Sequence, residues 1–343
     1  KLQVLDKKSD MAQMTGFDDG EEETVINLTV KPGMKQGWFG NAYGGYGSKD
    51  RYEGNAMVNR FVNNDQITFM GGANNTNNMG FSDLASTMFS GMGGGGGRRG
   101  GFGAGSGITS SGNAGLNFSK EFKPDKLTLG GNTRYSHSDN DARSKSDRQN
   151  ILPGDSSSYD NSEAMSRTKS DNFGVDFRLE WKPDTMTQLI FRPSFSFSHS
   201  MNDNFSDATT LDNERDTVNT NKSSNYSESN GYNLNASIDF SRKLNNKGRV
   251  FSATLSGGNS DSYSDGMNRS DIVYFNQTDA LKNSIIDQRS RYDNKGFNYR
   301  AYVSWVEPIG HNNFIQATYS ISQRKQEALK NVYNQDADGI YNV

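Results

Sequence analysis

Hydrophobic and polar residues alternate along many parts of the chain. In residues 173–181, FGVDFRLEW, the odd positions hold Phe, Val, Phe, Leu and Trp, whereas the even positions hold Gly, Asp, Arg and Glu. The same alternation recurs in residues 114–122, 127–137, 189–198, 232–240, 297–305 and 315–321. A period of two predicts β-strands with one apolar and one polar face, and helical spacing fits none of these runs.

Two kinds of connection alternate between the predicted strands. Short connections rich in Pro, Asp, Asn and Gly are expected at 63–65, 123–126, 182–185, 244–248 and 307–312. Long polar loops are expected at 77–107, 138–168, 200–228 and 260–293, with strand ends extending into two of them. Compact soluble domains rarely contain several such loops, whereas transmembrane β-barrels routinely have short turns at one end and long loops at the other.

The composition of the polar faces bears on which face points inward. A soluble β-sandwich would bury the Phe and Leu side chains and expose the charges. The polar faces are mostly Gly, Ser and Asn, which are small enough for a crowded, wet lumen. The large aromatic residues before short turns suit the interfacial girdle of a membrane barrel; they are Phe122, Trp181, Phe240 and Trp305. We therefore predict an all-β fold, an antiparallel up-and-down transmembrane β-barrel, with a soluble β-protein as the alternative.

The number of strands indicates a partial barrel. About eleven strands are predicted between Gly37 and residue 328, and bacterial barrels usually have an even number. The chain then ends within an expected loop, so we interpret it as a piece of a larger barrel.

Composition narrows the function further. The mean hydropathy of -0.85 suggests a loop-rich chain, but aromatic residues reach 11%, so the apolar content is concentrated in segments. A net charge of -3 gives no global attraction to nucleic acid, and the absence of cysteine removes disulfides and thiolate chemistry. The sequence contains no apolar run of about 18 residues, so no transmembrane helix is predicted.

A family resemblance is carried mainly by the first 80 residues. The segments that carry it are VLDKKSD at 4–10, TGFDDG at 15–20, VINL at 25–28, GWFGNAYGGYG at 37–47, RYEGN at 51–55 and NNTN at 74–77. Together they resemble the passage from plug to barrel in TonB-dependent-receptor-like outer-membrane proteins. The resemblance implies that residues 1–36 are the end of a plug domain and its linker. It also implies that residues 37–343 are the N-terminal part of a barrel of about 22 strands.

The function implied by this resemblance is uptake across the outer membrane of a Gram-negative bacterium. The cargo would be a bulky nutrient, such as a metal chelate, a glycan or a peptide. Implied partners are outer-membrane lipid, the protein's own plug, the TonB complex through a segment preceding this chain, and a surface lipoprotein as a candidate. The alternative is a structural or adhesive surface barrel without transport.

Seven charged residues are predicted on the inward, polar faces of the strands. They are Arg134, Asp176, Arg178, Glu180, Arg192, Asp239 and Arg300. Such residues could contact the plug or cargo, but pairing across neighbouring strands is the preferred interpretation.

Other motifs give weaker predictions. NQDADG at 334–339 resembles the start of a calcium loop through Asn334, Asp336 and Asp338, although Asn replaces the first Asp and a solvated loop is preferred. The glycine-rich run at 93–107 lacks a phosphate-binding spacing and is interpreted as an outer loop. We predict no resident cofactor. We also predict no catalysis, because the three histidines, His137, His199 and His311, are scattered and the first two are expected at strand ends.

Overall fold

The fold is all-β. The computed structural model describes residues 2–8, 22–28, 36–77, 107–151, 157–245, 247–275, 283–310, 313–336 and 339–342. These residues contain no helix, and therefore none long and apolar enough to cross a membrane. The predicted all-β class is confirmed.

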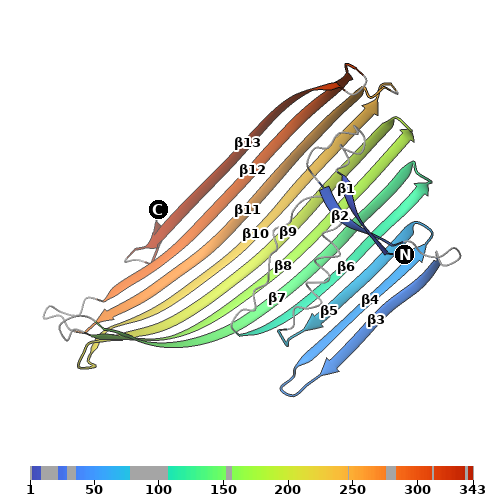
Figure 1. The fold of residues 1–343 in the computed structure, drawn as a ribbon. Helices are drawn as coiled ribbons and strands as arrows, with labels where there is room; N and C mark the ends of the chain where they lie inside the picture. The colour runs from blue at the N-terminus through green and yellow to red at the C-terminus, as the bar shows by residue number, and fades with distance from the viewer. Residues whose placement is uncertain are drawn as a thin grey trace.

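Two sheets make up the structure (Figure 1). Strands β1 (Leu2–Lys8) and β2 (Glu22–Leu28) pair antiparallel with each other in a separate two-stranded sheet. The large sheet contains β3 (Gln36–Tyr46), β4 (Tyr52–Val62), β5 (Asp65–Asn74), β6 (Ile108–Lys123), β7 (Leu127–Asn150), β8 (Ser158–Asp184), β9 (Thr187–Leu211), β10 (Thr217–Lys243), β11 (Val250–Tyr274), β12 (Ser284–Pro308), β13 (Phe314–Gln335) and β14 (Tyr341–Asn342).

The large sheet is an antiparallel meander in which each strand pairs with the next one along the chain. Its eleven long strands, β3 to β13, match the predicted number and begin near the predicted Gly37, but β13 continues past the predicted end at 328 to Gln335. Strand β14 adds only two residues. Among the described residues the outermost strands do not pair with each other, so the sheet is open and curved (Figure 1).

The short turns lie where turn residues predicted them, with one exception. Turns follow Val62, Lys123, Lys243 and Pro308. The Lys182–Thr185 segment was predicted as a turn, but β8 continues to Asp184 and the chain reverses at 185–186. A register shift between Trp181 and Asp184 lets the strand continue through Pro183.

Three of the four predicted long loops are wrong: most of 138–168, 200–228 and 260–293 is strand. The strands β7 to β12 run for 24 to 27 residues, and at about 3.3 Å per residue β8 is roughly 90 Å long. Apolar residues such as Met165 and Phe205 are scattered in these segments and do not alternate along one face, yet backbone pairing continues. The fourth segment, 77–107, lies largely outside the described residues.

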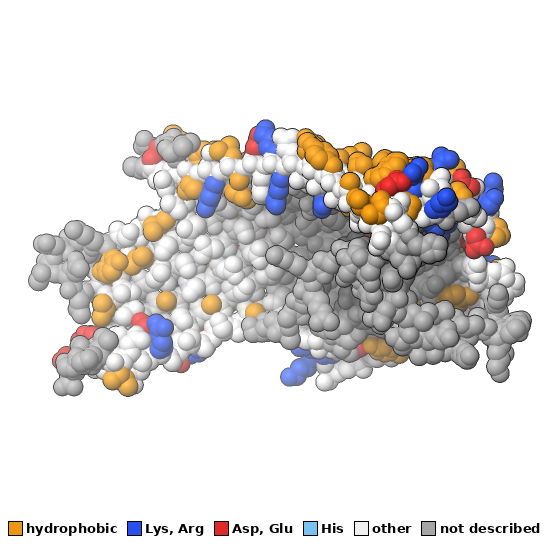
Figure 2. All heavy atoms as spheres, turned by 45° about the horizontal axis from the view of Figure 1, so that its top comes forward, with side chains coloured by type: hydrophobic (Ala, Val, Ile, Leu, Met, Phe, Trp, Pro, Cys, Tyr) orange, Lys and Arg blue, Asp and Glu red, His pale blue; other side chains and the backbone are white. Residues whose placement is uncertain are grey.

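The register joins alternate residues of all strands into two continuous faces. One face carries Phe173, Phe177 and the residues paired with them, and the other carries Gly174, Asp176 and theirs. The second face is concave. Figure 2 looks into a hollow whose visible wall is drawn mostly white, as neither hydrophobic nor charged. We call the two faces convex and concave.

The most buried side chains lie on the concave face. Met70, Ile190, Val250 and Val306 are the buried hydrophobic residues of the described chain, and all four share that face with buried Asn, Ser and Thr. The packed side of the sheet is therefore the polar one.

Candidate functional site

The convex face carries an exposed apolar band. Four of its members from different strands, Phe177, Phe195, Ile238 and Val303, keep 40%, 38%, 40% and 39% of their surface exposed. A sandwich core would bury such side chains almost completely. The band thus faces away from the interior of the sheet's curve.

The band runs obliquely across the strands. One row of directly paired residues crosses the sheet from β4 to β13, and it changes from apolar to charged; it contains Val58, Phe69, Leu116, Thr133, Val175, Phe195, Leu234, Asn259, Phe297 and Lys325. On β13 the apolar residues lie nearer the short turns, at Ile315, Tyr319 and Ile321. A band of constant height on tilted strands has this geometry.

Aromatic rings gather at the short-turn end of the convex face. Phe251 lies 6.3 Å, centroid to centroid, from both Phe240 and Trp305. The indole Nε1 of Trp305 donates a hydrogen bond to Glu307 at 3.1 Å. The ring bodies thus pack within the band, and a polar group lies at its edge.

All seven predicted charged residues lie on the concave face. Arg134 contacts Asp176 of the next strand at 2.5 Å, with Asn132 as a second acceptor at 2.9 Å. Arg192 pairs with Asp239, whose other oxygen accepts from Thr254 Oγ1 at 2.8 Å. These two pairs join neighbouring strands and satisfy buried or half-buried charge locally.

The remaining three predicted residues behave differently. Arg178 lies 3.3 Å from Glu180 on the same strand, and Lys182 and Gln188 contact the same carboxylate at 2.6 and 3.0 Å. Arg300 makes no hydrogen bond or ion pair with any other described residue. The structure therefore neutralises six of the seven within local groups and leaves Arg300 outside them.

The calcium-loop residues are engaged in local contacts where they are described. Asn334 Oδ1 accepts from Gln288 Nε2 at 2.8 Å, and Asp336 Oδ1 accepts from the Ile340 amide at 2.8 Å. Asp338 lies outside the described residues, as does most of the glycine-rich run. Within the described part of the chain, no three His, Cys, Asp or Glu side chains are grouped to hold a metal ion. Calcium binding stays a prediction.

A feature that the sequence prediction missed is the charge on the convex face beyond the apolar band. We call the strand halves beyond the band, 138–150, 158–172, 198–211, 217–231, 260–274, 284–296 and 323–335, the polar extension. Its convex face carries many charged residues of both signs, whereas its concave face is mostly Ser, Thr, Asn and Ala. The signal was present in β7 as a charged residue at every second position from Asp139 to Asp147.

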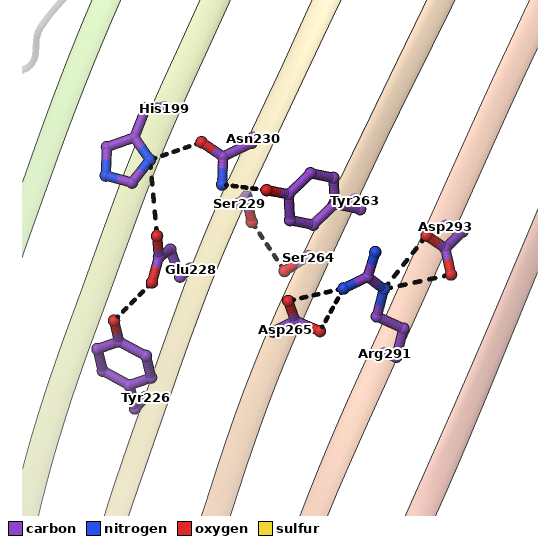
Figure 3. A network of polar contacts seen from close by, with 10 residues as sticks. All are labelled: His199, Tyr226, Glu228, Ser229, Asn230, Tyr263, Ser264, Asp265, Arg291 and Asp293. Carbon is purple, nitrogen blue, oxygen red and sulfur yellow. Dashed lines mark hydrogen bonds and ion pairs between the residues drawn. The ribbon is translucent and has the colours of Figure 1, made fainter.

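Contacts between charged and polar side chains connect the strands of the extension (Figure 3). Arg291 of β12 bonds Asp265 of β11 at 2.9 Å and Asp293 of its own strand at 3.3 Å. His199 Nδ1 contacts Asn230 at 2.8 Å, and Asn230 in turn donates to Tyr263 at 3.2 Å. The predicted position of two histidines at strand ends is wrong, because His137 lies in the middle of β7 and His199 in the middle of β9. The third, His311, lies outside the described residues.

Ion pairs lower the pKa of two carboxyl groups in the extension. Arg167 of β8 donates to Asp139 of β7 at 2.8 and 3.0 Å and holds the pKa of that carboxyl below its ordinary value. Arg148, and then Asn150, lower the pKa of Asp160 in the same way. Both groups are charged at neutral pH and link β7 to β8.

The sequence matches no protein-family model, and no curated protein is significantly similar to it. The resemblance to TonB-dependent-receptor-like proteins, including the domain limits 1–36 and 37–343, stays a prediction. The sites above therefore rest on geometry and chemistry alone.

Proposed function

We propose that this chain is part of an outer-membrane β-barrel whose convex band contacts lipid and whose concave face lines a water-filled lumen. The observation that carries the proposal is the exposed apolar band, which crosses the sheet from β4 to β13 opposite the polar face that holds the most buried side chains. Exposed apolar patches above a few hundred Å² mark binding or membrane surfaces. In a bilayer, a strand needs about 9–11 tilted residues, and the apolar part of β8, residues 173–181, is of that size.

Within this barrel, the proposed activity is receptor-type uptake of a bulky nutrient, a metal chelate, a glycan or a peptide. The protein would lie in the outer membrane of a Gram-negative bacterium, with a plug in a barrel of about 22 strands and energy from the TonB complex. A surface lipoprotein is a candidate partner. The paired concave charges support a lumen that stays hydrated but has few unneutralised groups, and no nucleic-acid or catalytic role is proposed.

A structural or adhesive surface barrel is the second candidate. The observation that favours it is the polar extension, in which residues 158–172 of β8 project about 50 Å along the strand beyond the apolar band. A tall, charged outer surface could contact other cells or matrix without any transport.

Membrane insertion and pore formation test the two levels of the proposal. We expect the protein to fractionate with outer membranes, to need detergent for extraction and to migrate faster on gels before heating than after. Purification without detergent in a folded, monodisperse form would contradict the membrane assignment. Energised, TonB-dependent accumulation of a cargo in cells would support transport. If the protein folds correctly in the membrane but cells accumulate no cargo, the structural role is favoured.

A further inference from the structure

Charge is divided unequally along the concave face. On β4 to β10, concave residues of both signs occur, and those described above form local groups. On β11 to β13, the concave face carries three cations, Arg300, Arg324 and Lys330, and no carboxylate among the described residues. This part of the concave face is therefore unbalanced and positive, although the chain as a whole has a net charge of -3.

The register brings two of the cations within reach of one ligand. Arg300 of β12 lies opposite Ser322 of β13, and Arg324 lies opposite Asn298. The two arginines are thus diagonal neighbours on one face, about 7–8 Å apart along the backbone and somewhat closer at their Cβ atoms. Lys330 is six residues further along β13, about 20 Å from Arg324 and deeper in the polar extension.

Local contacts leave the charge of these side chains unneutralised. Arg300 has no hydrogen bond or ion pair within the described chain, and Arg324 Nη2 has only a long contact of 3.3 Å to the neutral Oε1 of Gln326. Both arginines and Lys330 are exposed. Two adjacent cations repel each other, and a bound anion would relieve this repulsion.

We infer that Arg300 and Arg324 form a binding site for an anionic group of the cargo, a carboxylate or a phosphate, with Lys330 as a second point of attraction. Guanidinium groups bind both anions through two parallel hydrogen bonds. Ser256 and Ser322, which flank Arg300 on the neighbouring strands, can add hydroxyl donors. The role in uptake rests on the proposed function, whereas anion binding itself does not require transport.

Calorimetry on the purified protein, folded in detergent, tests the site with inorganic pyrophosphate and citrate as probes and sucrose as the neutral comparison. We expect both anions to bind and sucrose not to bind. Arg300→Gln and Arg324→Gln should each weaken anion binding about tenfold or more. Arg300→Lys should retain part of the affinity, because it keeps the charge but loses the planar fork. The matched control is Lys325→Gln, which removes a charge next to Arg324 but from the convex face.

Three outcomes would overturn the inference: no anion binding by the unaltered protein, unchanged affinity in both arginine variants, or an equal loss in Lys325→Gln. A β-rich circular dichroism spectrum matching that of the unaltered protein shows that a variant is folded. Anion binding by a protein that fails to enter membranes would contradict the proposed function but leave this site standing. Membrane insertion without anion binding would contradict this site but leave the proposed function standing.

Discussion

On the convex face, Tyr232 of β10 lies directly opposite Asp261 of β11. The paired row that contains them is aromatic from Tyr135 of β7 as far as Tyr232, and charged from Asp261 as far as Glu327 of β13. The edge of the apolar band therefore crosses this row between two adjacent strands. The proposed membrane location accounts for this shift, because paired rows on tilted strands are not parallel to a flat bilayer.

Arginine substitutions at two aromatic positions of β9 should have different effects. Phe195 and Phe205 both lie on the convex face and are 38% and 41% exposed, but only Phe195 lies in the apolar band. In vesicles we expect Phe195→Arg to lower the free energy of unfolding by roughly 2–4 kcal/mol. Phe205→Arg should change it by less than about 0.5 kcal/mol. Urea unfolding of both variants measures the difference, and equal effects would contradict the lipid contact.

Gly131 should resist enlargement. It lies between Phe118 and Phe177, whose rings pack edge to face at 6.3 Å, and an added Cβ would lie 2.6 Å from the Phe177 ring. Gly131→Ala should cost roughly 1–3 kcal/mol of stability, because the rings must move. The control is Gly257→Ala on the same face, where the nearest atom lies 3.6 Å away. Equal unfolding midpoints for the two variants would show that the ring pair does not constrain β7.

The Arg192–Asp239 pair should contribute measurably to stability. Its side chains are only 23% and 25% exposed, and Thr254 donates to the same carboxylate. In a double-mutant cycle of Arg192→Gln and Asp239→Asn we expect a coupling free energy of about 1–3 kcal/mol. The exposed Lys145–Glu163 pair provides the comparison, with a coupling close to zero. A coupling no larger for the first pair would contradict its structural role.

Acid should destabilise the polar extension before the part of the sheet that carries the apolar band. Because Arg167 lowers the pKa of Asp139 in the folded state, the pair stabilises the fold above the ordinary pKa of about 3.9, and this stabilisation is lost as the pH falls through the lowered value. Asp160 behaves likewise. Hydrogen exchange at pH 6 and near pH 3 should show lost protection at 139–148 and 160–168, with little change at 173–181. Uniform loss along β8 would contradict this prediction.

Sequence alternation predicted the strands where one face is apolar and the other polar. The run from Phe173 to Trp181 identified the middle of β8, and the turn residues after Val62 and Lys123 identified the reversals. The seven concave charges could be placed on one face because side-chain direction in a strand has a period of two. Their partners depend on register, which no single strand determines.

The polar extension could not be predicted from hydrophobic alternation because neither of its faces is apolar. Residues 138–150 of β7 look like a loop by composition, yet every second residue from Asp139 to Asp147 is charged. Hydrogen bonds between backbone groups maintain these strands, and the polarity of the side chains does not indicate such pairing. That Arg300 has no ion pair with a described residue could not be predicted either. It depends on the register with β11 and β13, whose described concave residues include no carboxylate.

Labelling of single cysteines in bilayers tests the central claim most directly, because the chain has no cysteine of its own. Phe195 and Ser196 are adjacent in β9 but lie on opposite faces. An environment-sensitive fluorophore attached in Phe195→Cys should emit as in hydrocarbon and be quenched by nitroxides on lipid chains. The same fluorophore in Ser196→Cys should be quenched by aqueous iodide. If the Phe195→Cys label meets water, or if lipid nitroxides quench both labels equally, the convex band does not face lipid and the account is wrong.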